Sequence, residues 1–67
     1  MAVARVTEIS ATSAQSFEDA IKDGLERADA TLRNVTSAWI KEQHVRLASG
    51  AITEYQVNML VTFVLDD

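Results

Sequence analysis

Apolar side chains alternate with polar ones in the last part of the chain, from Tyr55 to Leu65. The odd-numbered positions are all apolar, whereas the even-numbered positions mix polar residues with Leu60 and Val64. Because side chains point to alternate faces along a strand, this pattern predicts a long β-strand with one face buried fully and the other partly. We therefore expect a strand from Ile52 to Leu65, and the rest of the chain has to cover its odd-numbered face.

A different spacing occurs earlier in the chain, where apolar residues recur at three- and four-residue steps and predict an α-helix from Phe17 to Arg33. Ser16 is the candidate N-cap, because its hydroxyl can accept a hydrogen bond from a free backbone amide of the first turn. Gly24 lies within the apolar stripe, although glycine costs about 1 kcal/mol relative to alanine in a helix interior. We therefore expect the helix backbone to approach the sheet closely there. The helix should end near Asn34, which can adopt the left-handed cap conformation.

Two further stretches have the composition of strands. The first, Ala2–Ser10, has no cleanly apolar face, suits a sheet edge and ends at the turn-like patch Ala11-Thr12-Ser13. The second, Val35–Leu47, is followed by the turn Ala48–Ala51, whose glycine is free to take a positive φ, and so short a connection predicts an antiparallel hairpin. The predicted fold is α+β, with the order β-α-β-β and a three-stranded antiparallel sheet wrapped on one helix, in a single domain over residues 1–67.

The predicted elements differ in length. A strand from Ile52 to Leu65 spans about 45 Å at roughly 3.3 Å per residue, whereas a helix from Phe17 to Arg33 spans about 25 Å at about 1.5 Å per residue. One helix cannot cover that sheet. The chain has 67 residues, of which 48% are hydrophobic, and no Cys to add cross-links. We therefore expect copies of the chain to bury the remaining apolar surface in a homo-oligomer.

Charge and segment composition exclude some classes of partner. The net charge is −4 and the six basic residues are scattered, which argues against a nucleic-acid-binding protein. The sequence contains no run of 18 apolar residues, so no membrane span is expected. The first residues lack the charged start and apolar centre of a signal peptide, which makes the cytoplasm the default location.

Few residues suggest catalysis. Strict alternation along the second strand places His44 on one face with Glu42 and Arg46, and Trp39 on the other face with Gln43. His44 is the only histidine, and the sequence predicts no Ser or Cys beside it. A surface or interface histidine is therefore the simpler interpretation, and no enzyme is expected.

The carboxylates form no calcium loop, since the pattern Asp-x-Asp-x-Asp-Gly does not occur. A solvated acidic surface is their simpler interpretation. The alternative is that acidic side chains of several subunits converge on a cation, with the candidates Glu8, Glu42, Glu54 and Asp66-Asp67.

Trp39 is the single tryptophan and lies in the middle of a predicted strand. Most such residues anchor a core or an interface. The alternative is a flat ligand stacked on the indole, with Gln56 of the adjacent strand at the edge of the ligand. A primary amide suits that place, because it can both donate and accept hydrogen bonds.

Several stretches resemble the dodecin family, and together they cover essentially the whole chain. The similar stretches are the helix, the segment after the first strand, and both halves of the third strand. The matching residues are Ala11-Thr12-Ser13, Ser16-Phe17-Glu18-Asp19-Ala20-Ile21, Arg27-Ala28, Thr31-Leu32-Arg33-Asn34, Glu54-Tyr55-Gln56-Val57 and Val61-Thr62-Phe63-Val64-Leu65.

The resemblance implies a hollow homododecamer that binds flavin (riboflavin, FMN or FAD) for storage and without catalysis. Flavins in the family lie at two-fold interfaces, stacked on a Trp of the second strand and held at the ring edge by a Gln of the third. Gln56 matches that glutamine. The family's stacking Trp falls at Ser37, and Trp39 lies two residues further along, so Ser37, Trp39 and Gln56 are the expected ligand-binding residues.

The second strand is also similar to a flavin-free branch of the family whose members include calcium-binding proteins. The alternative function is therefore a structural or calcium-binding particle of the same fold. The resemblance identifies no particular calcium ligands in this chain.

Overall fold

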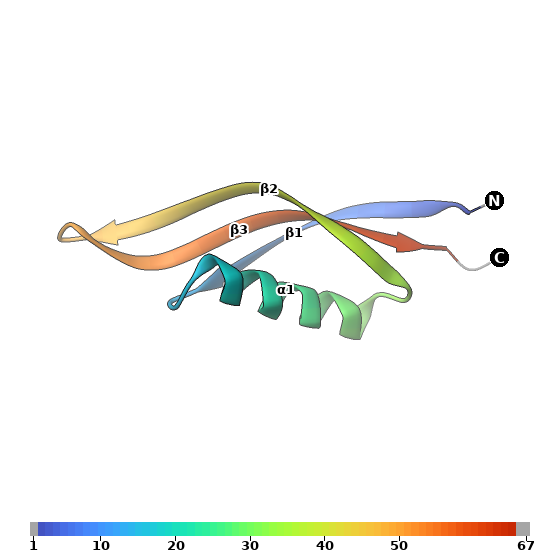
Figure 1. The fold of residues 1–67 in the computed structure, drawn as a ribbon, viewed down its shortest axis with the longest axis horizontal. Coiled ribbons are helices and arrows are strands. Elements are labelled where there is room, and N and C mark those ends of the chain that lie inside the picture. Colours follow the sequence, from blue (N-terminus) through green and yellow to red (C-terminus); the bar gives the residue numbers. More distant parts are fainter. Residues whose placement is uncertain (1, 66–67) are drawn as a thin grey trace.

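The computed structural model describes residues 2–65, and their fold is the predicted β-α-β-β arrangement. The elements are β1 (Ala4–Ser13), α1 (Phe17–Thr31), β2 (Val35–Ala48) and β3 (Ala51–Val64). β3 lies in the centre of the sheet and pairs antiparallel with β1 on one side and β2 on the other. The helix packs against one face of the sheet and leaves the other face bare (Figure 1).

Local sequence signals determine where the helix begins and how the chain leaves it. The Ser16 hydroxyl accepts a 3.0 Å hydrogen bond from the backbone amide of Asp19, which confirms the predicted N-cap. The helix ends at Thr31, two residues earlier than expected, and Leu32 closes it through a bond from its amide to the carbonyl of Ala28. Asn34 adopts the left-handed conformation, with φ of 61°, but it lies two residues beyond the C-cap Leu32, so it turns the chain into β2 and does not cap the helix as predicted.

The core lies between the helix and the odd-numbered face of β3. Val57, Met59 and Val61 are fully buried there, as is Ala20 of the helix. Gly24 meets this face directly, because a Cβ placed on it would lie 2.7 Å from Met59 Cε. The predicted close approach of helix and sheet is therefore confirmed.

The patch Ala11-Thr12-Ser13 differs from the prediction, because it continues strand β1 and does not form a turn. Its three residues complete the pairing with β3, opposite Val57, Gln56 and Tyr55. The chain leaves the sheet only after Ser13, whose hydroxyl accepts from the Gln15 amide and donates to Asp19 at 2.8 Å. A polar composition indicated a loop, but the partner strand keeps the segment extended.

Strand β2 is irregular, and this corrects the predicted assignment of its faces. The register against β3 shifts between Val35 and Ser37 and again between Ile40 and Glu42. The second shift is a one-residue irregularity at Lys41, so the alternation of faces restarts after it. Trp39 therefore shares a face with Glu42, His44 and Arg46, and not with Gln43.

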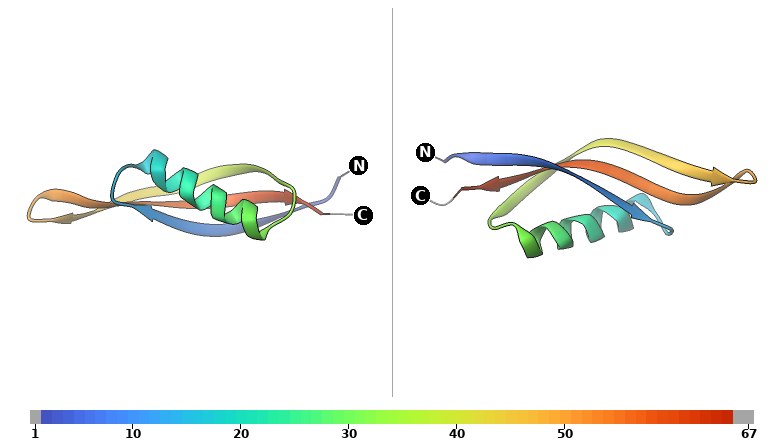
Figure 2. Two further views of the ribbon diagram at one scale, coloured as in Figure 1. Left: turned by 90° about the horizontal axis from the view of Figure 1, so that it is seen from below. Right: turned by 180° about the vertical axis from the view of Figure 1, so that it is seen from behind.

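The sheet extends well beyond the helix. The described chain measures 52 × 19 × 13 Å, and the β2–β3 hairpin projects past the first turn of α1 (Figures 1 and 2). No helix within residues 2–65 is long and apolar enough to cross a membrane. Large apolar side chains left exposed are Val3, Val6, Trp39, Ile40, Leu47, Ile52 and Leu65.

Candidate functional site

The bare face of the sheet, which we call the outer face, carries a hollow of about 320 Å³. All three strands contribute to its lining, which consists of Val6, Ser37, Trp39, Leu60 and Thr62. Trp39 is the largest of these side chains and is 72% exposed. The indole therefore stands as an uncovered aromatic wall beside an apolar floor, which is a suitable surface for stacking a flat ring.

Sheet register brings these residues together. Trp39 lies opposite Leu60, while Ser37 on β2 and Val6 on β1 both lie opposite Thr62. Directly paired residues of antiparallel strands point to the same face, so two hydroxyl groups border the apolar floor. Ser37 and Trp39 thus lie on one face, as predicted, and they line the same hollow.

Gln56 lies on the same outer face but outside this hollow. It is four residues from Leu60 along β3, about 13 Å at roughly 3.3 Å per residue. The irregularity at Lys41 places Trp39 on the same face as Gln56. Without it, Trp39 would point toward the helix side of the sheet.

A chain of hydrogen bonds holds the Gln56 side chain. Its amide nitrogen donates to Ser10 Oγ at 3.0 Å and to Asn58 Oδ1 at 3.2 Å. Its amide oxygen accepts from Arg46 Nη2 at 2.7 Å. Asn58 in turn donates to Glu42 Oε1 at 2.9 Å. No sequence pattern indicated this cluster, because the partners come from three strands and only the register shows that they meet.

The candidate cation ligands are held apart within the described chain. Glu8 pairs with Lys41 at 3.1 Å and Glu54 with Arg46 at 2.8 Å, while Glu42 accepts from Asn58. Residues 2–65 contain no group of three or more His, Asp or Glu side chains that could hold a metal ion. The expectation for Asp66-Asp67 lies outside the described residues.

His44 lies opposite Gln56 in the sheet register. Its face holds Glu42 and Arg46, as predicted, but both of these side chains bond to other partners. Within residues 2–65, no hydrogen bond joins His44 to a serine or a carboxylate. The histidine therefore has no nucleophile or orienting group of a catalytic set in this part of the chain.

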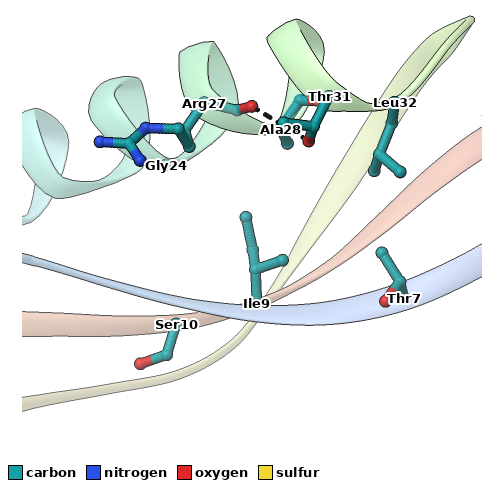
Figure 3. Close-up of a pocket in the computed structure, with 8 residues that line it drawn as sticks. All are labelled: Thr7, Ile9, Ser10, Gly24, Arg27, Ala28, Thr31 and Leu32. Carbon is teal, nitrogen blue, oxygen red and sulfur yellow. Dashed lines mark hydrogen bonds between the residues drawn. The ribbon is translucent and has the colours of Figure 1, made fainter.

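A second hollow, of about 390 Å³, lies between α1 and the edge strand β1 (Figure 3). Ile9 points from the strand toward the helix across it, and Gly24 and Ala28 form the helix side. Arg27 and Thr31 border it, and the Thr31 hydroxyl donates to the Arg27 carbonyl within the helix at 3.3 Å. No sequence pattern indicated this hollow, since it depends on how far the helix stands from the edge strand.

The sequence profile of the family described as Dodecin matches residues 3–66. The chain belongs to the dodecin family. A search of curated proteins found no match. Solved dodecins share the fold over nearly the full length of the chain, and the one from Streptomyces davaonensis is 38% identical, with a TM-score of 0.93 over 98% of this chain and 97% of that one.

Two other dodecins extend the comparison. An arginine-to-alanine mutant of the Thermus thermophilus dodecin is 33% identical, with a TM-score of 0.93 over 100% of this chain and 98% of that one. The calcium dodecin of Mycobacterium tuberculosis, described as a calcium-chelating antigen with a novel calcium-binding site, is 29% identical. Its TM-score is 0.82, over 96% of this chain and 91% of that one. The β-α-β-β fold is thus the dodecin fold.

Proposed function

We propose that this dodecin holds a small planar ligand on its outer face, without catalysing a reaction on it, and that flavin is the ligand. The observation that carries the proposal is the exposed Trp39 wall of the outer-face hollow, in a chain that belongs to the dodecin family. The indole and Leu60 would stack against the rings, and Ser37 would border their edge. Rings laid along β3 would extend toward Gln56, which would hold the far edge.

Self-association is part of the same proposal. The helix leaves large apolar side chains uncovered on the outer face and the projecting hairpin, and Val6 and Trp39 of the hollow are among them. A chain of this size gains stability when copies of itself cover such surface. We infer a homo-oligomer of the dodecameric kind that the family resemblance implied, with ligand sites where subunits meet.

A titration tests flavin binding. Addition of the protein should quench riboflavin fluorescence, and riboflavin should quench the emission of Trp39, the only tryptophan of the chain. Trp39→Ala should weaken binding by about tenfold or more, because a stacked aromatic pair and the buried ring area are lost together. A flat titration of the unmodified protein by both signals would overturn flavin binding.

Calcium binding is the second candidate function, favoured by the similarity to the calcium dodecin and by the net charge of −4. Carboxylates of neighbouring subunits would have to supply the ligands, since those of residues 2–65 do not group within one chain. Calcium should then raise the melting temperature of EDTA-treated protein, whereas an equal ionic strength of sodium should not. An unchanged melting temperature would rule against this candidate.

A further inference from the structure

The direction of each hydrogen bond around Gln56 is determined by its two charged neighbours. Arg46 has only donors, so the atom of Gln56 that faces it at 2.7 Å must be the amide oxygen. At the other end, the Glu42 carboxylate only accepts, so Asn58 presents its amide nitrogen to Glu42 and its oxygen to Gln56. A reversed Gln56 amide would place two donors against each other at Arg46.

This arrangement limits what Gln56 can offer to a ligand. Its amide nitrogen carries two hydrogens, and Ser10 and Asn58 accept one each. Its oxygen has two lone pairs, of which Arg46 uses one. Gln56 can therefore accept a hydrogen bond from a ligand, but it can donate only if it first breaks one of its own bonds.

Arg46 supplies the donors that Gln56 lacks. Its guanidinium has five N–H groups in one plane, and the described contacts use one at Nε for Glu54 and one at Nη2 for Gln56. The side chain is 56% exposed, and its other three N–H groups have no described partner and lie on the same guanidinium that contacts the Gln56 oxygen. The pair therefore presents an acceptor next to a donor on the outer face.

We propose that Arg46 is a ligand-binding residue that acts together with Gln56. Arg46 donates to a ring carbonyl of the ligand, while the Gln56 oxygen accepts from the adjacent ring N–H. The ligand class is a planar ring with an imide or lactam edge. This inference depends on the proposed function, because it assigns the hydrogen-bonding end of the same ligand site.

Two ligands and four proteins test the assignment. Riboflavin carries an imide N–H, and its N3-methyl derivative lacks that donor and keeps the carbonyl groups. The unmodified protein should bind riboflavin about tenfold more tightly than the methyl derivative, the size expected for one hydrogen bond to a fixed partner. Arg46→Ala should weaken the binding of both ligands by about tenfold, since the bond from a charged donor to the ring carbonyl is lost. The preference for riboflavin should remain, because Asn58 still holds the Gln56 amide nitrogen and leaves the Gln56 oxygen to accept from the imide N–H. Lys22→Ala, which removes the same charge from the exposed side of α1, should change neither value.

The outcomes separate the two proposals. Binding of neither ligand by the unmodified protein would overturn the proposed function, and the assignment of Arg46 with it. Equal binding of both ligands by the unmodified protein, or an Arg46→Ala protein that binds riboflavin as tightly as the unmodified protein does, would overturn the assignment alone. Arg46→Lys serves as the second variant, because it keeps the charge but not the planar set of donors. It should bind both ligands as weakly as Arg46→Ala does. A Lys variant that binds like the unmodified protein would overturn the assignment, because the positive charge alone would then account for the effect of Arg46.

Discussion

The two faces of strand β3 differ in role, although both come from the same alternation of side chains over Tyr55–Leu65. On the helix face, Val57, Met59 and Val61 are fully buried, and apolar residues of the helix pack against this core. On the outer face, Gln56 and Asn58 form side-chain hydrogen bonds between strands, and Leu60 lines the floor of an open hollow. Stability and ligand contact are therefore separated by side-chain direction within one strand, and mutations on the two faces should have different consequences.

Met59→Ala should give the largest loss of stability, because it leaves a cavity between sheet and helix. Loss of a buried side chain of this size costs about 2–5 kcal/mol. Urea unfolding at a fixed protomer concentration measures the change, and Leu60→Ala, its half-buried neighbour on the outer face, is the matched control. Equal losses for the two variants would contradict the separation of faces.

Gly24→Ala should be the next most destabilising change, although alanine is the better helix former. Its Cβ would lie 2.7 Å from Met59 Cε and 2.9 Å from Ala11 Cβ. Overpacking of this kind costs about 1–3 kcal/mol, which exceeds the gain of about 1 kcal/mol in helix propensity. Thermal unfolding checks the sign, with Ala30→Gly at an exposed site of the same helix as control for propensity alone. A stabilised Gly24→Ala protein would show that helix and sheet can move apart.

Trp39→Ala should separate binding from stability. The indole is 72% exposed in the single chain, so its removal should change the free energy of unfolding of a dissociated chain by about 0.5 kcal/mol or less. Ligand affinity should fall strongly in the same variant. Chemical unfolding at a protomer concentration at which the chain is dissociated checks the first statement, and flavin titration of the assembled protein checks the second. A loss of stability of the dissociated chain as large as that of Met59→Ala would refute the first.

Lys41→Ala should have the smallest effect. The Lys41–Glu8 pair crosses the outer face at 3.1 Å, but both side chains are nearly half exposed. Exposed ion pairs contribute about 0–1 kcal/mol and weaken with salt. A melting temperature that responds to the substitution at low salt and not at high salt would fit this contribution, whereas a large loss at both would indicate that the pair has a further structural role.

Sequence patterns predicted the features that depend on neighbouring residues. The Ser16 cap, the left-handed conformation of Asn34, the close approach at Gly24 and the long last strand are confirmed, because each depends on local geometry or on a simple period. Features that depend on a partner strand were missed. Ser13 continues a strand only because Tyr55 lies opposite it.

The candidate site shows the same limit. Ser37 and Trp39 were placed on one face correctly, since they lie two residues apart on the same side of the irregularity in β2. The face of Gln43 was wrong relative to Trp39, because an extra residue in a strand leaves no clear mark in composition. The bonds of Gln56 to Arg46 and Ser10 could not be predicted, because they join three strands whose register was unknown.

Lys41 gives this molecule an unusual sensitivity to changes in length. Deletion of that single codon would restore strict alternation between Ser37 and Arg46, so that Trp39 and Arg46 would point to opposite faces of the sheet. A lineage could gain or lose this combination of indole and guanidinium through one insertion or deletion, with every amino acid of the pair left unchanged.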